Sequence, residues 1–135
     1  MNVLVMGCGR IGSEVASRLW QEGNTVTVLD LELENFFRLP TGLRDTEGAT
    51  LVGDGTLQDV LKVAGVDQAD VFVAVDVRDS RNALAAQKAK YIFHVPRVVC
   101  RIGDPIRQQM YSELGLTAVS PTQLTSNLIM EAIQL

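Results

Sequence analysis

Cysteine and histidine are scarce in this chain of 135 residues, which contains two cysteines and one histidine. Cys8 and Cys100 lie far apart and show none of the short spacings that typify zinc ligands, so the sequence predicts no metal site. His94 falls in a predicted loop with no acid and nucleophile near it in the sequence, and we expect it to be structural or exposed. Cysteine and histidine, two side chains that often carry nucleophilic or acid–base catalysis, are therefore almost absent.

Long apolar runs and basic clusters are also missing. No run approaches the roughly eighteen residues needed to cross a bilayer, and the first apolar stretch reads as a strand rather than a secretory signal. We therefore expect a chain that does not itself span a membrane. The 12 Lys and Arg residues are outnumbered by 16 Asp and Glu, giving a net charge of −4. Nucleic acid is not an expected partner, because phosphate backbones are bound mainly through Lys and Arg.

A glycine motif, G-C-G-R-I-G at residues 7–12, follows the apolar run 2–6. In such motifs Gly7 permits a tight strand-to-helix turn, Gly9 lets the backbone approach a pyrophosphate, and Gly12 lets the helix pack closely on the sheet. Asp30 ends the second apolar run about twenty residues later, where this fingerprint expects a carboxylate that accepts from ribose hydroxyls. The pattern predicts a nucleotide site; the alternative is an ordinary glycine turn with Asp30 as a solvated strand end.

The two cysteines differ in what their positions allow. Cys8 lies in the glycine motif beside a predicted helix N-terminus, which either lowers its pKa and makes it reactive or leaves it a plain free thiol. Cys100 lies within the apolar run 97–102, where a small buried hydrophobic residue is expected.

Apolar segments of strand length alternate with helical patterns along the chain. Predicted strands cover 2–6, 25–29, 49–52, 71–75, 97–102 and 118–119, and predicted helices follow the glycine motif and cover 33–39, 57–64, 79–93, 105–114 and 121–135. Pro40 and Gly42 interrupt the segment after the second strand, so we expect a loop there. The alternation predicts one α/β domain over 1–135, a doubly wound six-stranded parallel sheet of Rossmann-like type. A chain of this length is too short for a separate substrate domain.

The last predicted helix carries more apolar surface than contact with one sheet requires. Ser120 and Gln123 have the form of a capping box, with Pro121 at the first helical position. The apolar residues of this helix are Leu124, Leu128, Ile129, Met130, Ala132, Ile133 and Leu135. We therefore expect another chain or a further domain to cover part of this surface.

Several segments together resemble one family, the RCK or TrkA-N type regulatory domains of potassium channels and transporters. The resemblance covers essentially the whole chain and rests on the glycine motif, Asp30, G-D-G-T at 53–56, 69–75, Asn82, 99–101, 114–115 and 119–121. Many members of this family continue into a smaller C-terminal ligand-binding lobe, which we do not expect in this chain. We therefore do not expect this chain to be regulated by a ligand of that lobe.

The resemblance implies a role for each residue of the site. The phosphates are lined by Gly7, Gly9, Arg10, Ile11 and Gly12, the ribose is held by Asp30, and the adenine is bordered by Asp54 and Thr56. Asp30 would repel a 2′-phosphate, which disfavours NADP. Arg10 suits terminal phosphate oxygens and so favours ATP, ADP or AMP over NAD(H); its alternative is a solvated surface residue. Asp54 accepts from the adenine amine or, equally well, serves as an acid near a helix N-terminus.

Three further residues are second-tier candidates at the carboxyl ends of the fourth and fifth strands. Asp76 and Asn82 flank the point where the strand order is expected to reverse and ligands bind. Arg101 either reaches an anion or pairs with Asp104.

The expected function is that of a non-catalytic, nucleotide-binding cytoplasmic subunit, peripheral to the inner face of the cell membrane. It would form a homodimer or larger ring and gate the membrane subunit of a potassium channel or transporter. One alternative is the cofactor domain of a small NAD-dependent oxidoreductase, which the missing substrate domain and the lack of acid–base groups oppose. The other is a soluble redox or energy sensor, because fold alone does not fix function.

Overall fold

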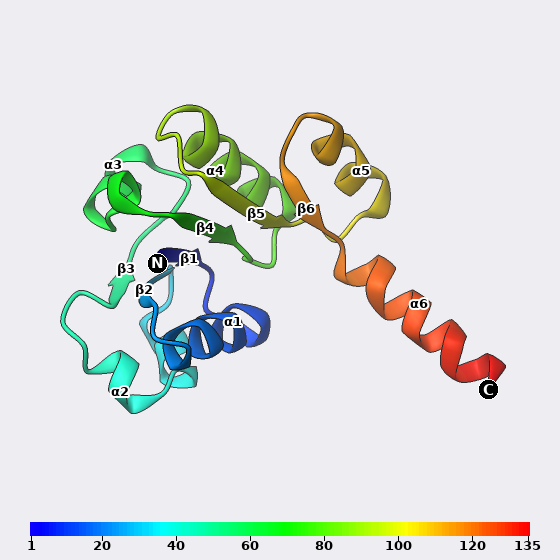
Figure 1. The fold of residues 1–135 in the computed structure, drawn as a ribbon, viewed down its shortest axis with the longest axis horizontal. Helices are drawn as coiled ribbons and strands as arrows, with labels where there is room; N and C mark the ends of the chain where they lie inside the picture. The colour runs from blue at the N-terminus through cyan, green and yellow to red at the C-terminus, as the bar shows by residue number, and fades with distance from the viewer.

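The computed structural model describes residues 1–135 and contains one six-stranded sheet in which every strand is parallel to its neighbours. Its strands are β1 (Asn2–Met6), β2 (Thr25–Asp30), β3 (Thr50–Val52), β4 (Val71–Ala74), β5 (Arg97–Arg101) and β6 (Thr117–Val119). Their order across the sheet is β3-β2-β1-β4-β5-β6 (Figure 1). The predicted doubly wound, Rossmann-like sheet is therefore confirmed.

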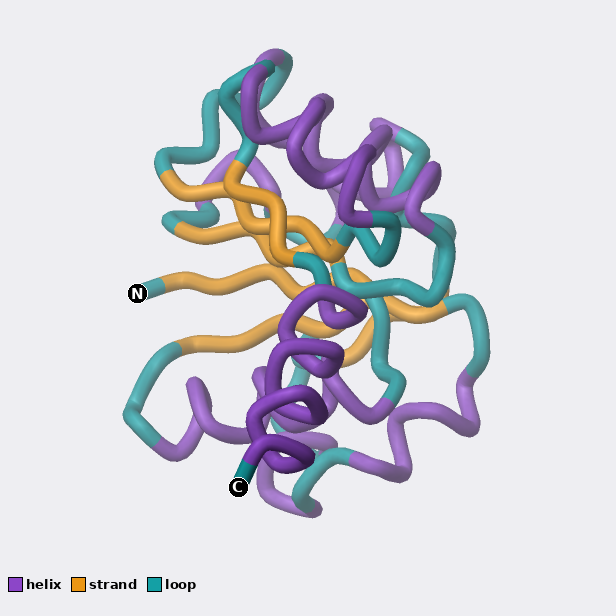
Figure 2. Tube along the Cα trace, turned by 90° about the vertical axis from the view of Figure 1, so that its right-hand side faces the viewer, coloured by secondary structure: helices purple, strands orange, loops and turns teal.

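Helices cover both faces of the sheet, as Figure 2 shows. They are α1 (Arg10–Gln21), α2 (Thr41–Arg44), α3 (Gln58–Val63), α4 (Asp79–Tyr91), α5 (Pro105–Glu113) and α6 (Pro121–Gln134), with 3-10 helices at Leu33–Arg38 and Val66–Gln68. Alternate residues of β1 enter different cores, because successive strand side chains point to opposite faces. Val3 and Val5 pack with the α1 side, whereas Leu4 and Met6 pack with the α3 and α4 side.

The strand order reverses at β1, which pairs with β2 on one side and β4 on the other. The crossover from β1 through α1 leads to β2, and the chain later returns to the other side of β1 as β4. In open parallel sheets, the crevice at the carboxyl ends of the strands beside such a switch point is where ligands bind. The glycine motif follows β1 and therefore lies at this place.

The segment between β2 and β3 is more helical than the sequence predicts. The expected two-turn helix is a 3-10 helix, Leu33–Arg38, and the expected loop contains the single turn α2. Pro40 ends the first helix, because it has no N–H to donate, and its fixed φ suits the residue before the next turn. Leu39 and Leu43 are buried beside α1, so packing on the sheet accounts for a turn that propensity does not favour.

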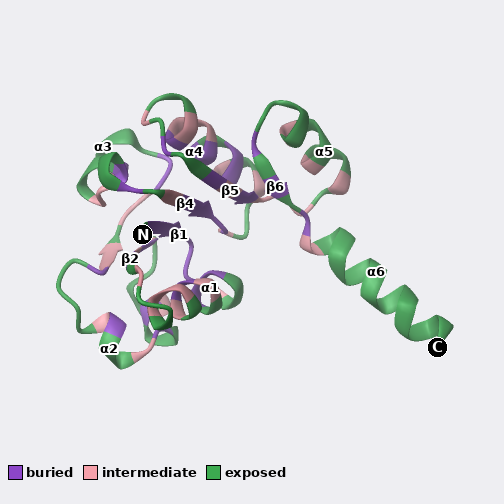
Figure 3. Cartoon of the chain, viewed as in Figure 1, coloured by how far each residue is buried: buried purple, intermediate pink, exposed green.

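Helix α6 leaves the sheet and extends away from the domain (Figures 1 and 3). Ser120 Oγ accepts from the backbone N–H of Gln123 at 3.2 Å, which confirms the cap, but the Gln123 side chain donates to Asn127 instead of completing the box. No residue of α6 is buried. No helix of the structure combines the length and the apolar character needed to cross a membrane.

Candidate functional site

Gly7 and Gly12 are required by the protein itself. Gly7 has φ +109°, and a Cβ there would lie 2.7 Å from the backbone N of Asp76 at the end of β4. A Cβ on Gly12 would lie 1.8 Å from Gly7 O, closer than any non-bonded contact allows. These positions agree with the tight turn and the close helix packing predicted for them.

Gly9 differs from both, because nothing in the protein demands a glycine there. Its φ of −80° and ψ of −160° are open to other residues, and a Cβ would meet no atom within 4 Å. The open space beside it belongs to a cavity at the carboxyl ends of the strands. A glycine at this position is explained if another molecule must approach the backbone.

The N-terminus of α1 has unused hydrogen-bond donors. The N–H groups of residues 9–12 have no acceptor in the protein. The first N–H group of this turn that donates to the backbone is that of Ser13, which lies 2.9 Å from Gly9 O. The first turn of α1 contains no acidic side chain. Free N–H groups and the aligned peptide dipoles make such a terminus a site for an anion.

The cavity has a volume of about 540 Å³ and contains most of the predicted site residues. Those that line it are Gly7, Gly9, Arg10, Ile11, Asp30, Asp76 and Arg101. Gly12, Asp54, Thr56 and Asn82 do not line it, although Gly53 and Gly55 do. Arg10 is exposed, and its guanidinium makes no hydrogen bond or ion pair within the protein, so it is free to meet a ligand.

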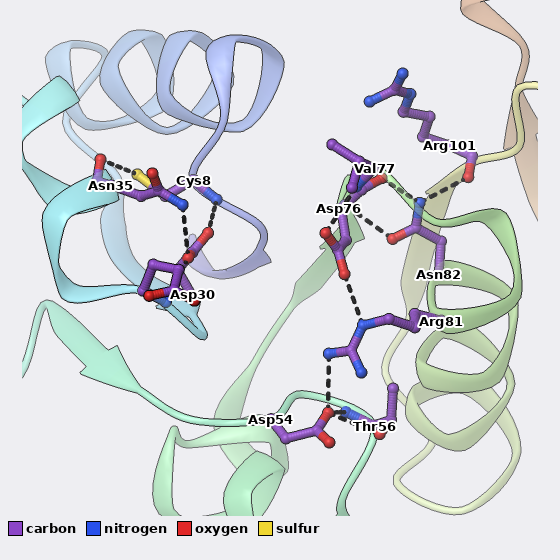
Figure 4. A network of polar contacts seen from close by, with 11 residues as sticks. Cys8, Asp30, Asn35, Asp54, Thr56, Asp76, Val77, Arg81, Asn82 and Arg101 are labelled. Carbon is purple, nitrogen blue, oxygen red and sulfur yellow. Dashed lines mark hydrogen bonds and ion pairs between the residues drawn. The ribbon is translucent and has the colours of Figure 1, made fainter.

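The carboxylate of Asp30 already ties the glycine turn to the end of β2. Its Oδ2 accepts from the backbone N–H of Cys8 at 2.7 Å, and its Oδ1 accepts from Glu32 N at 2.8 Å and Asn35 Nδ2 at 2.9 Å (Figure 4). Each carboxylate oxygen accepts about two bonds, so Oδ2 retains capacity for a ribose hydroxyl. Sequence reasoning missed Asn35, whose only signal was its place five residues after Asp30.

The Cys8 thiol is not activated. It is fully buried, and Sγ donates to Asn35 O at 3.3 Å. Burial, together with the neighbouring Asp30 carboxylate, raises the pKa of Cys8 to about 11. This shift is opposite to the lowered pKa that the reactive alternative requires, so the structure favours a plain free thiol. Cys100 is buried as expected, and burial raises its pKa to about 11 as well.

Arg81 joins the predicted residues Asp54 and Asp76. Its Nε lies 2.7 Å from Asp76 Oδ2, and its Nη2 lies 2.9 Å from Asp54 Oδ1 (Figure 4). Partial burial would raise the pKa of Asp54, but hydrogen bonds from Thr56 and the Arg81 guanidinium outweigh it and hold that pKa below its usual value. A carboxyl group with a lowered pKa loses its stabilising contribution only as the pH falls through that pKa, so the ion pair of Asp54 with Arg81 persists at neutral pH.

The sequence predicted only part of the cluster formed by Asp54, Arg81 and Asp76. Asp54 and Asp76 were candidates, but Arg81 was missed because it is 27 residues from Asp54 along the chain. The only sequence feature that could have pointed to Arg81 is its position next to Asn82, at the start of a predicted helix that follows Asp76.

Asn82 and Arg101 have different roles. Asn82 is fully buried; it accepts from Asp76 N at 2.8 Å and donates to Asp76 O and Arg101 O at 2.7 and 2.9 Å. It therefore holds the ends of β4 and β5 together rather than facing the cavity. Arg101 makes no ion pair with Asp104, which instead pairs with Arg107 at 3.7 Å. Arg101 Nε is buried without a hydrogen-bond partner, which favours the anion alternative.

His94 lies outside this site. It is exposed, with φ +55°, in the turn between α4 and β5. The expectation of a structural or exposed histidine is confirmed.

A parallel sheet with its switch point at β1, a glycine turn and an uncapped helix N-terminus define a Rossmann-type domain, a class that holds nucleotides at this place. The family model of the TrkA-N domain matches residues 3–121, and the chain belongs to the TrkA-N family.

Two curated relatives show how much of a longer protein the chain covers. The Trk system potassium uptake protein TrkA of Streptomyces coelicolor is 39% identical over 127 residues, covering 94% of this chain and 56% of that protein. The TrkA homolog of Pyrococcus abyssi is 31% identical over 139 residues, covering 98% of this chain and 60% of that protein. The chain thus spans somewhat more than half the length of these relatives.

Solved structures share the fold at low sequence identity. The TrkA-N domain of the inner membrane protein ybaL from Escherichia coli has a TM-score of 0.83 at 14% identity, covering 97% of this chain and 95% of that chain. The GsuK channel bound to NAD has a TM-score of 0.81 at 20% identity over 98% of this chain and 23% of that chain. The Shewanella denitrificans Kef CTD in AMP bound form has a TM-score of 0.78 at 23% identity, covering 99% of this chain and 80% of that chain.

Proposed function

We propose that this chain is the nucleotide-binding lobe of a cytoplasmic regulatory subunit that controls a potassium channel or transporter at the inner face of the cell membrane. Membership in the TrkA-N family and relatives named as Trk system potassium uptake proteins support this role. The proposed input is ATP, ADP, AMP or NAD(H), in line with the NAD and AMP named for two structural neighbours. A nucleotide shifts such a system only if it binds one arrangement of the assembly better than another.

The observation that carries the proposal is the open space beside Gly9, which is lined by N–H groups without acceptors. The N–H groups of residues 9–12 have no acceptor, Arg10 is free, and a Cβ on Gly9 would enter empty space in the cavity. Nucleotide phosphates fit these donors, and Asp30 Oδ2 has capacity for the ribose. Arg101, with its unpartnered Nε, supplies a further cation on the β5 side of the same cavity.

The proposed role is regulatory rather than catalytic. Both cysteines are buried with a raised pKa, and Asp76 is held in an ion pair with Arg81. The groups that line the cavity thus bind and orient a nucleotide, and none forms a nucleophile and base pair of the kind that catalysis needs.

Arg10→Ala tests how the phosphates are held. We expect the affinity for ATP to fall about tenfold and that for AMP to change less than about twofold, because the guanidinium fork suits terminal phosphate oxygens. Calorimetric titration measures both constants. Arg18→Ala is the matched control, since Arg18 is exposed on the same helix and pairs only with Glu14. Equal losses for ATP and AMP would show that Arg10 does not contact terminal phosphates.

Assembly as a homodimer or ring is proposed from α6. Its apolar side chains are more than half exposed at Leu124, Leu128, Ile129, Met130 and Ile133, a surface that a second copy can cover. Light scattering of the purified chain is expected to give at least a dimer, and Leu128→Glu is expected to shift it toward monomer. Asn127→Glu, the same charge on a polar position of α6, is the control. A monomer at high concentration contradicts the assembly.

A further inference from the structure

Asp54 does not line the cavity, although its neighbours in the chain do. Gly53 and Gly55 on either side of it line the cavity, but Asp54 Oδ1 accepts from Thr56 N at 3.0 Å, from Thr56 Oγ1 at 2.7 Å and from Arg81 Nη2 at 2.9 Å. Arg81 does line the cavity. Of these two paired side chains, the one that lines the cavity is therefore the guanidinium of Arg81.

Arg81 is fixed before any ligand arrives. Asp76 holds its Nε and Asp54 holds its Nη2, so the flat guanidinium bridges the turn after β3 and the end of β4 (Figure 4). Its side chain is only 20% exposed, and its third nitrogen, Nη1, donates no hydrogen bond. A side chain immobilised in this way loses little further rotamer entropy on contact with a ligand.

The charge balance indicates what kind of group belongs beside Arg81. One guanidinium with two carboxylates carries a net charge of −1, which does not attract a phosphate. The phosphate donors lie instead at Gly9 and Arg10. The lining of the cavity also includes the apolar Leu29 and Val75. A flat, uncharged group with ring nitrogen acceptors fits this end, and the part of a nucleotide with that chemistry is its base.

We propose that Arg81, held by Asp54 and Asp76, contacts the nucleobase of the bound nucleotide and makes the site prefer purines over pyrimidines. A guanidinium stacks on aromatic faces and donates to ring acceptors, and a purine offers the larger face. This inference rests on the proposed nucleotide site and adds the residue that determines its preference among bases. Asp54 then acts by positioning Arg81.

Calorimetric titration with ADP and UDP tests the inference, because the two ligands differ only in their bases. We expect the wild-type chain to bind ADP at least about tenfold more tightly than UDP. In Arg81→Ala the affinity for ADP is expected to fall about tenfold while that for UDP changes less than about twofold, so the preference is lost. Arg81→Lys, which keeps the charge but not the planar fork, should lose the preference too and guards against a folding defect in the alanine variant.

Arg78→Ala is the matched control, because Arg78 is exposed three residues earlier and does not line the cavity. It is expected to keep the preference for ADP. Equal losses of ADP and UDP in both Arg81 variants would overturn the inference and leave Arg81 as a support of the β3 turn, and so would equal wild-type affinities for the two ligands. If the wild-type chain binds neither, the proposed nucleotide site itself is wrong, and the inference falls with it.

Discussion

Gly9→Ala is expected to weaken ADP binding about a hundredfold, equivalent to about 2.7 kcal/mol, with only a small change in the stability of the free protein. The backbone of Gly9 is open to alanine and its Cβ would touch nothing in the protein, but it would occupy the space where phosphates reach the N–H groups of residues 9–12. The unfolding free energy is expected to stay within about 1 kcal/mol of the wild-type value, because alanine restricts the unfolded chain but caps a helix less well than glycine. Calorimetry measures the binding and urea denaturation the stability.

The matched control is Gly103→Ala. Its Cβ would make ordinary contact at 3.4 Å with Asp79 Oδ1, and Gly103 does not line the cavity. This variant is expected to bind ADP like the wild-type chain. If Gly9→Ala also binds ADP normally, the phosphates do not lie over the glycine turn.

Gly12→Ala is expected to have the opposite pattern, a large loss of stability. Its Cβ would lie 1.8 Å from Gly7 O and 2.8 Å from Gly7 C, both backbone atoms that cannot move without opening the turn between β1 and α1. We expect the unfolding free energy to fall by about 4 kcal/mol or more, a large part of the roughly 5–15 kcal/mol that stabilises a domain. Thermal and urea denaturation measure this loss.

Gly9→Ala serves as the control for this variant, since it makes the same chemical change three residues away in the same turn. A Gly12→Ala protein with wild-type stability would mean that α1 does not approach Gly7 as the structure has it. The two variants together separate what the fold requires from what a ligand requires.

The fold was predictable because its signals are local and repeated. Strand-length apolar runs, the glycines with positive φ that end α1 and α5, and the Asp104 and Ser120 caps each specify an element boundary to within a few residues. The segment between β2 and β3 was less predictable, because burial of Leu39 and Leu43 on the α1 side stabilises turns that the sequence around Pro40 does not favour.

The site was predictable where one motif contains its residues. Gly7, Gly9 and Arg10 lie within four consecutive residues and Asp30 follows at a characteristic distance, so the proposed phosphate and ribose end could be named from the sequence as a set of candidates. The far end depends on contacts between distant segments, since Arg81 reaches Asp54 only through the fold. The same contacts hold Asp54 against Thr56 and Arg81, an arrangement that no spacing in the sequence encodes.

The measurement that tests the central claim most directly is an amide NMR titration of the isotope-labelled chain with ADP. The claim is that a nucleotide binds with its phosphates on the N-terminus of α1 and its ribose at Asp30. The account predicts saturable shifts that are largest for the amides of residues 9–12, with further changes at Asp30 and Asn35, and no such shifts in Gly9→Ala. No saturable shift at millimolar ADP, or shifts confined to residues away from the carboxyl ends of the strands, would contradict it.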